Sequence, residues 1–331
     1  MKILIVRLSS MGDIIHALPL AANARAGGAT VGWLTDRPYG GLLEGNPSLS
    51  RVFLADTRRW RRNPFSPANW RDVARLRRAL RDFAPDATVD VQGLWKSAVL
   101  ARMAGAPVVS FSVAARREPS SAVLVSTGVG LARDAVHIVD QNASLLAPLG
   151  LPFAGTAPDA RYLLAGESPA ASAFLSTLPA PFALYHPGAS RAGKTWPVEK
   201  YAELAARLER DPGLSPVVSW GPGDEARAAL LSALLPKASK IPPLDFRGLA
   251  RVIARASLFV AADTGPVHLA DALGVPALAL FGPDAHRRNI PERNGPYRGA
   301  AMGYDQTASV ETVARKALDL VRNASKINDA R

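Results

Sequence analysis

The chain has 331 residues, no cysteine and a formal net charge of +12 at pH 7. This length predicts two domains with cores of their own, and the lack of cysteine excludes disulfide bonds and thiolate metal sites. The first apolar run is too short for a signal peptide and no stretch of about 18 apolar residues predicts a membrane span, so we expect a cytoplasmic protein.

Strands and helices alternate along the chain, which predicts parallel sheets with helices on both faces. In the first half we expect strands at 2–8, 31–35, 52–54, 88–91 and 108–111, and helices at 14–26, 69–83, 95–104 and 137–149. A stretch rich in proline and glycine follows from residue 149 to residue 181. In the second half we expect strands at 182–185, 216–220, 258–262 and 277–281, and helices at 197–210, 224–235, 245–255, 266–273 and 309–323.

This α/β pattern predicts two doubly wound, Rossmann-like domains. We place the N-terminal domain at residues 1–165, the second domain at 166–308, and a C-terminal helix and tail at 309–331 that can pack back on the N-terminal domain. Doubly wound sheets bind ligands at the carboxyl ends of their strands, so we expect the loops at these ends to face a central cleft.

Positive charge is concentrated in the first half of the chain. Ten arginines and only two aspartates lie between Arg51 and Arg81. Within this block, residues 58–62 form a cluster that we expect to be a loop, and helix 69–83 has its apolar positions at helical spacing: Trp70, Val73, Leu76, Leu80 and Phe83. The helix can simply carry a solvated cationic face. The 58–62 cluster favours binding an anion, and nucleic acid, acidic lipid headgroups and a polyanionic sugar are all compatible with it.

A carboxylate follows the first strand. Gly12 allows a close turn, and Asp13 then stands at the start of a helix. As an N-cap Asp13 is a structural residue. As a cleft carboxylate it can take a proton from a hydroxyl, and we expect nothing nearby in sequence to neutralise it. The loop has neither the Gly-Lys-Ser/Thr of a P-loop nor a G-x-G-x-x-G fingerprint, so both of those interpretations are excluded.

Two loops of the second half suit a nucleotide. Residues 186–197 are rich in small residues and contain Lys194, a mobile cation suited to a diphosphate, although a plain surface loop is the alternative. Residues 221–226 have the form G-x-G-x-x-A, but proline in the turn and the position in the chain argue against a dinucleotide fingerprint. Glu225 in this segment can instead hold ribose hydroxyls.

A third loop is the most informative one. Asp263-Thr264-Gly265-Pro266-Val267-His268 directly follows strand 258–262 and begins a helix. Thr264 or Asp263 can cap this helix and Pro266 suits its first turn. Free backbone N–H groups, a carboxylate and an imidazole then lie together, which suits an anionic, hydroxyl-rich ligand such as a sugar nucleotide. A well-capped helix without a ligand is the alternative.

Three separated motifs together resemble glycosyltransferase family 9, the ADP-heptose:lipopolysaccharide heptosyltransferases. They are Ser10-Met11-Gly12-Asp13-Ile14-Ile15-His16-Ala17-Leu18-Pro19, His186-Pro187-Gly188-Ala189-Ser190 with Lys194 and Trp196-Pro197, and Asp263-Thr264-Gly265 with His268-Leu269. The resemblance covers nearly the whole chain. It implies the GT-B fold, in which the N-terminal domain holds the acceptor and the C-terminal domain holds the nucleotide sugar.

The resemblance also implies roles for single residues. Asp13 is expected to be the general base. The residues expected at the donor are Ala189, Ser190, Lys194, Glu225, Asp263, Thr264, Gly265 and His268. Ala189 replaces a hydroxyl residue found in relatives, and Pro266-Val267 also differ from them, so details of donor binding depart from the family pattern.

Finer features are similar to the heptosyltransferase I branch, which adds the first heptose to Kdo. They include Arg58-Arg59-Trp60-Arg61-Arg62, 92–98 and Arg117-Glu118-Pro119. The implied acceptor-binding residues are Arg59, Arg61, Arg62, Lys96 and Arg117. The implied reaction is an inverting transfer from ADP-L-glycero-β-D-manno-heptose to Kdo-lipid A. It needs no cofactor and no metal, and the chain has no Asp-x-Asp motif.

The basic face is expected to rest on anionic lipid of the inner leaflet, which implies peripheral, salt-sensitive attachment to the cytoplasmic membrane. Two alternatives stay open. One is heptosyltransferase II or another family 9 transferase. The other is a non-catalytic nucleic-acid-binding protein. The sequence contains no recognised nucleic-acid-binding module, so we expect no nucleic-acid partner.

Overall fold

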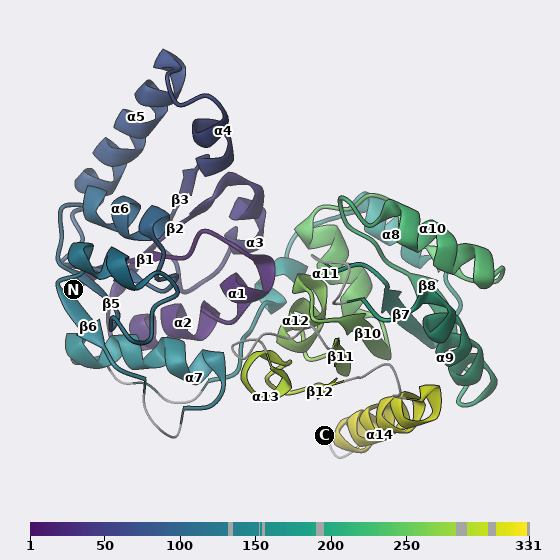
Figure 1. Ribbon diagram of the computed structural model, residues 1–331. Coiled ribbons are helices and arrows are strands. Elements are labelled where there is room, and N and C mark those ends of the chain that lie inside the picture. The colour runs from purple at the N-terminus through teal and green to yellow at the C-terminus, as the bar shows by residue number, and fades with distance from the viewer. Residues whose placement is uncertain are drawn as a thin grey trace. The chain divides into compact units, whose positions relative to one another are not determined.

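The computed structural model divides into two compact units, Met1–Tyr162 and Leu163–Arg331 (Figure 1). It describes residues 1–131, 135–151, 153, 156–189, 195–282, 290–303 and 309–329, and for residues 301, 303 and 325–329 the backbone alone. Within these ranges, no helix combines the length and the apolar character needed to cross a membrane.

The N-terminal unit is built on a six-stranded parallel sheet in the order β3-β2-β1-β4-β5-β6. Its strands are β1 (Lys2–Val6), β2 (Thr30–Asp36), β3 (Arg51–Ala55), β4 (Ala87–Asp90), β5 (Val108–Phe111) and β6 (Thr127–Val129). The central strands are buried on both faces, because helices cover both, so they are near-continuous apolar runs.

Side chains alternate between the two faces of this sheet. Leu4 and Val6 of β1 share a core with α5 (Pro67–Phe83) and α6 (Trp95–Met103). On the other face, α2 (Leu18–Ala26) packs against α7 (Ile138–Ala143). Shorter helices follow the strand ends: α1 (Met11–Ile15) after β1, α3 (Gly40–Leu43) after β2 and α4 (Thr57–Arg62) after β3.

The C-terminal unit repeats this topology, with a parallel sheet in the order β12-β11-β10-β7-β8-β9. Its strands are β7 (Phe182–His186), β8 (Ser215–Val218), β9 (Ser239–Lys240), β10 (Leu258–Ala262), β11 (Ala277–Phe281) and β12 (Ala300–Gly303). Its helices are α8 (Pro169–Leu175), α9 (Val198–Arg210), α10 (Glu225–Leu234), α11 (Phe246–Ala254), α12 (Gly265–Ala272), α13 (Pro291–Asn294) and α14 (Val310–Asp329). The predicted pair of doubly wound α/β sheets is therefore confirmed.

The last helix belongs to the core of the C-terminal unit. Val313, Ala314 and Ala317 of α14 are buried in the cluster that also contains Leu204 and Leu208 of α9. The apolar face of α14 is thus covered by α9 within this unit. That residues 309–331 also pack on the N-terminal domain stays a prediction.

The arginine block differs from its prediction in two ways. Residues 58–62 were expected to be a loop but belong to helix α4, whose first turn is capped by the Asp56 carboxylate accepting the N–H of Arg59 at 3.4 Å. Trp70 was expected on the apolar face of α5 but is 63% exposed, because the face that packs on the sheet is formed by Leu76, Leu80 and Phe83. The predicted helix 14–26 is also divided, into α1 and α2.

Candidate active site

Asp13 lies just beyond the carboxyl end of β1, in the first turn of α1. Its Oδ2 accepts hydrogen bonds from the backbone N–H of Ser10 at 3.0 Å and from the Ser10 hydroxyl at 2.9 Å. Its Oδ1 lies 2.6 Å from Nη2 of Arg7, whose Nη1 donates to the Val91 carbonyl at 2.9 Å. The expectation that nothing nearby neutralises Asp13 is wrong, because Arg7, the last residue but one of the predicted first strand, forms an ion pair with it.

The pKa of Asp13 follows from these contacts. Burial raises this pKa. The Arg7 charge and the two Ser10 hydrogen bonds together lower it by more than burial raises it, so the pKa falls to about 2. The Asp13 side chain is nevertheless 31% exposed, while that of Arg7 is only 10% exposed. Asp13 is therefore an ionised, oriented and partly exposed carboxylate, which can accept a hydrogen bond from a hydroxyl group.

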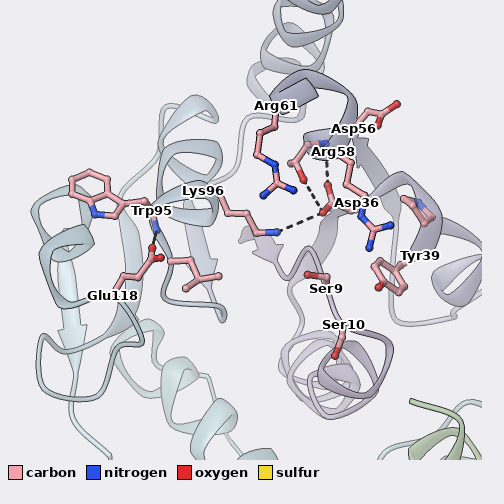
Figure 2. A pocket seen from close by; sticks show the side chains of 13 residues that line it. Ser9, Ser10, Asp36, Tyr39, Asp56, Arg58, Arg61, Trp95, Lys96 and Glu118 are labelled. Carbon is pink, nitrogen blue, oxygen red and sulfur yellow. Dashed lines mark hydrogen bonds and ion pairs between the residues drawn. The ribbon is translucent and has the colours of Figure 1, made fainter. Parts of the chain in front are cut away.

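A pocket of about 630 Å³ opens beside Ser9 and Ser10 in the N-terminal unit (Figure 2). Its remaining lining residues come from the segments after β2 and β3, from α4, from the start of α6 and from the loop after β5: Asp36, Pro38, Tyr39, Asp56, Thr57, Arg58, Arg61, Leu94, Trp95, Lys96 and Glu118. The strand ends of one sheet thus supply both Asp13 and this pocket.

The acidic side chains of the pocket are each held by the protein itself. Asp36 accepts the N–H and hydroxyl of Thr57 at 3.2 and 2.9 Å, and its Oδ2 lies 3.7 Å from Nζ of Lys96. Oδ2 of Asp56 lies 3.6 Å from Nε of Arg37, and Glu118 accepts the N–H of Trp95 at 2.5 Å.

By contrast, Arg58 and Arg61 have no ion-pair partner among the described residues. The guanidinium of Arg61 points toward the side chain of Lys96, which comes from the opposite wall, and the guanidinium of Arg58 lies next to Tyr39 (Figure 2). The pocket therefore offers free guanidinium groups to an anion, while its own carboxylates are occupied.

The predicted acceptor residues are only partly in this pocket. Arg61 and Lys96 line it. Arg59 instead forms ion pairs with Asp56 and Asp72 and so joins α4 to α5. Arg62 and Arg117 are exposed and do not line it. Arg58 was named only as part of the 58–62 cluster and not as an acceptor residue. Tyr39 was not predicted at all, because the short 3-10 turn after β2 has no periodic pattern in the sequence.

A buried ion pair fixes the loop that carries Glu118. Nη2 of Arg116 lies 3.3 Å from Oδ2 of Asp90 at the end of β4, and both side chains are fully buried. The same guanidinium donates to the hydroxyls of Ser110, at 2.7 Å, and Ser121, at 3.0 Å. Burial raises the pKa of Asp90, an effect that hydrogen bonds and the Arg116 charge only partly offset. No sequence motif indicated this pair, since its members lie 26 positions apart.

In the C-terminal unit, the Asp263 loop has the predicted form. It joins β10 to α12, and Oδ1 of Asp263 lies 3.3 Å from Nε2 of His268, one helical turn away. Thr264 is the N-cap residue, but its side chain makes no capping bond, and its buried Oγ1 has no partner within the described part of the chain. The helix N-terminus therefore presents backbone N–H groups and an unused hydroxyl, which suits an anion.

The loop after β7 is organised by a second histidine. His186 is buried, with Nδ1 3.1 Å from the Ser219 hydroxyl and Nε2 3.3 Å from Oδ2 of Asp224. Gly188 makes room for this arrangement, because a Cβ atom there would lie 2.1 Å from Cγ of Asp224. Ala189 follows, half-buried, whereas the predicted donor residues Ser190 and Lys194 lie outside the described residues.

Glu225 begins α10 beside this pair. It is exposed, and its Oε2 accepts the N–H of Gly223 at 2.9 Å. Asp224 and Glu225 thus have separate tasks, since the first holds His186 and the second displays a carboxylate at the surface. Sequence reasoning singled out Glu225 and missed Asp224 and His186 as a pair.

Comparison with known proteins identifies the family. The glycosyltransferase family 9 (heptosyltransferase) profile matches residues 73–310. Lipopolysaccharide heptosyltransferase 1 of Pseudomonas aeruginosa is 34% identical over 292 residues, which cover 86% of this chain and 79% of that protein. The protein of the same name from Escherichia coli K12 is 31% identical, over 86% of this chain and 88% of its own length.

A solved structure agrees with these relatives. E. coli heptosyltransferase WaaC with ADP-2-deoxy-2-fluoro heptose superposes with a TM-score of 0.76 at 28% identity, covering 96% of this chain and 99% of that one. The predicted resemblance and GT-B fold are thereby confirmed. The chain belongs to glycosyltransferase family 9, the heptosyltransferases, and it is a glycosyltransferase.

Proposed function

We propose that the protein transfers L-glycero-D-manno-heptose from ADP-L-glycero-β-D-manno-heptose to the Kdo of Kdo-lipid A, the heptosyltransferase I reaction of lipopolysaccharide inner-core synthesis. The observation that carries this proposal is the likeness, over almost the whole chain, to WaaC with an ADP-heptose analogue. The relatives named lipopolysaccharide heptosyltransferase 1 support the same choice within the family.

In this proposal the C-terminal domain binds the donor. Asp263 and His268 hold the heptose and diphosphate, with the hydroxyl of Thr264 and the backbone N–H groups at Gly265 as further donors. Ala189 and Ser190 line the phosphates, Lys194 neutralises them, and Glu225 contacts the ribose. His186 and Asp224 position the loop that carries Ala189.

The N-terminal domain binds the acceptor. Kdo carries a carboxylate and lipid A carries phosphates, which match the unpaired Arg58 and Arg61 of the pocket. Lys96 can leave its 3.7 Å contact with Asp36 to meet the same anion. Arg59, Arg62 and Arg117 add positive charge around the pocket, and in this proposal Arg59 acts by holding α4 in place.

Asp13 is the proposed general base. Its low pKa keeps the carboxylate deprotonated at neutral pH, so that it can accept a hydrogen bond from the Kdo 5-hydroxyl. As that oxygen attacks the anomeric carbon, its proton passes to Asp13 and the bond from the anomeric carbon to the ADP oxygen breaks. Attack from the face opposite ADP inverts the configuration.

The departing ADP gains negative charge as this bond breaks. We infer that Lys194 and the α12 backbone N–H groups stabilise that charge directly, so that the transfer needs no metal ion. The reaction is expected at the inner face of the cytoplasmic membrane, where the arginines of α4 and α5 attract anionic lipid, and high salt weakens this attachment.

The test is product analysis with the purified protein. Kdo₂-lipid A and ADP-heptose are incubated with and without a metal chelator, and the lipid is weighed by mass spectrometry. One added heptose under both conditions supports the proposal. A preference for an acceptor that already carries heptose would indicate a heptosyltransferase II activity. Binding of ADP-heptose without any product would mean that the acceptor is a different molecule.

A further inference from the structure

The connection between α4 and α5 displays two aromatic side chains to solvent. Phe65 is 91% exposed and Trp70 is 63% exposed. Phe65 directly precedes α5 and Trp70 lies in its first turn, and this end of the helix points away from the sheet (Figure 1). We call these two residues the aromatic tip. Exposed tryptophan and phenylalanine this close together leave a large apolar area in water, which soluble surfaces usually avoid.

The aromatic tip is held in place by polar contacts beneath it. Asn69 is buried, and its Nδ2 donates to the carbonyls of Asn63, at 2.7 Å, and Arg59, at 3.4 Å. The ion pairs of Asp72 with Arg59 and Arg75 join the two helices further. These contacts hold the turn in one conformation, in which Phe65 points into solvent.

Positive charge surrounds the aromatic tip. Arg62, Arg71, Arg77 and Arg78 are exposed, and within the described part of the chain none of the four has an ion-pair partner. Arg77 follows Trp70 by seven residues, so both lie on one side of α5. The carboxylate of Asp72, in the second turn of α5, is already occupied by Arg59 and Arg75. The surface thus combines aromatic rings with guanidinium groups that no carboxylate of the described residues neutralises.

We propose that the aromatic tip inserts into the interface of an anionic lipid bilayer, with the neighbouring arginines on the lipid phosphates. Tryptophan and tyrosine rings are enriched at the headgroup level of bilayers. A guanidinium group can donate two parallel hydrogen bonds to the oxygens of one phosphate. A nucleic-acid duplex would use the arginines but would leave Phe65 in water, and a protein partner would not require an excess of unpaired cations. The proposal rests on the proposed function, because a lipid-linked acceptor is the reason for binding a membrane.

The insertion would also serve the acceptor pocket. Arg61, which lines the pocket, belongs to the helix that leads into the aromatic tip. Docking of the aromatic tip would therefore hold the pocket close to the headgroup region from which the Kdo of the acceptor projects.

The test measures vesicle binding without any substrate. The full chain is mixed with vesicles of phosphatidylglycerol and phosphatidylethanolamine, with phosphatidylcholine vesicles as the uncharged comparison. We expect Phe65→Ala/Trp70→Ala to weaken binding to the anionic vesicles by roughly tenfold or more. The matched control is Leu230→Ala/Leu234→Ala, which removes two exposed apolar side chains of α10 and leaves binding unchanged.

Fluorescence locates the insertion directly. The chain has six tryptophans. Brominated anionic lipid should quench the wild-type emission, and most of this quenching should be lost in Trp70→Phe. Quenching that persists in Trp70→Phe, or binding that is equal in the Phe65→Ala/Trp70→Ala variant, would overturn the proposal. Light scattering tests whether the chain self-associates. Self-association that is lost in Phe65→Ala/Trp70→Ala and kept in Leu230→Ala/Leu234→Ala would also overturn the proposal, because a second copy of the chain would then cover the aromatic tip.

Activity assays separate this proposal from the proposed function. With a deacylated, water-soluble acceptor the aromatic-tip variant should turn over like wild type, whereas with acceptor embedded in vesicles its rate should fall. Normal vesicle binding without heptose transfer would contradict the proposed function alone. Heptose transfer with unchanged vesicle rates in the variant would contradict the insertion alone.

Discussion

The two units have the same strand order but pair different side chains at equivalent strand ends. At the carboxyl end of β1 in the N-terminal unit, Asp13 pairs with Arg7. At the carboxyl end of β7, the equivalent strand of the C-terminal unit, His186 pairs with Asp224. At the carboxyl end of β4, Asp90 forms a buried pair with Arg116. At the carboxyl end of the equivalent strand β10, Asp263 pairs with His268.

The partner determines what the site can do. An arginine is always charged, so it opposes protonation of the carboxylate beside it. A histidine beside a carboxylate can be neutral and can either donate or accept, which suits the hydroxyls and phosphates of a nucleotide sugar. We therefore expect the N-terminal pairs to act on charge and stability, and the C-terminal pairs to act on donor affinity.

The largest expected effect is at Asp13. Asp13→Asn removes the proposed base and should lower kcat by about 10²–10⁴-fold while ADP affinity stays unchanged. Steady-state kinetics with titration calorimetry separates the two quantities. Near-normal turnover of a folded Asp13→Asn protein would exclude Asp13 as the base.

The companion variant Arg7→Met tests the pairing itself. The pKa of Asp13, about 2 in the wild type, rises when burial is no longer opposed by Arg7. Asp13 is deprotonated above its pKa, so the variant should lose kcat/KM as the pH falls through the raised pKa, at values where the wild type is still unaffected. Superimposable pH profiles would show that Arg7 does not control Asp13.

The buried pair of the N-terminal unit should matter most for stability. Arg116→Met leaves the Asp90 carboxylate buried without its cation, which should cost about 3–5 kcal/mol of unfolding free energy. Because the pKa of Asp90 is raised by burial, the variant should lose stability as the pH rises through that pKa and regain it on acidification. Urea unfolding at several pH values measures both effects.

Two controls sharpen this result. Asp90→Leu/Arg116→Met removes both charges and should recover most of the stability lost in the single variant. Asp263→Asn changes the equivalent strand end of the other unit, where the carboxylate is paired with His268 at the start of a helix, and should weaken donor binding with little loss of stability. Equal destabilisation at both positions would remove the distinction between the two units.

In the C-terminal unit, Gly188→Ala should weaken donor binding about tenfold or more, because the new Cβ must displace Asp224 from His186. Calorimetry of ADP binding measures the loss. Gly221→Ala is the matched control, since its Cβ would meet Oδ2 of Asp224 at an ordinary 3.7 Å. Similar ADP affinity in both variants would mean that the His186–Asp224 pair does not position the donor loop.

The sequence predicted the strands better than it predicted the partners of the site residues. Strands 258–262 and 277–281 match β10 and β11 because parallel strands buried on both faces are plain apolar runs. The conformation of residues 58–62 was predicted wrongly, because the Asp56 cap and the contact of Arg59 with Asp72 stabilise a helix that the repulsion between arginines disfavours. The pairs Arg7–Asp13 and Asp90–Arg116 depend on rotamers and on loops that meet only in the folded chain, for which no spacing rule exists.

The smallest expected effect concerns the acceptor pocket and distinguishes two adjacent arginines. Arg61 lines the pocket and Arg62 does not, although both belong to α4 and both are exposed. Arg61→Met should raise the acceptor KM about tenfold by removing a charge-assisted hydrogen bond to the acceptor anion, whereas Arg62→Met should change it less than twofold with a water-soluble acceptor. The KM for the donor should be unchanged in both variants, because both arginines belong to the N-terminal unit, to which we assign acceptor binding. Equal effects of the two substitutions would show that the acceptor responds to the overall positive charge of α4, and not to the guanidinium that faces the pocket.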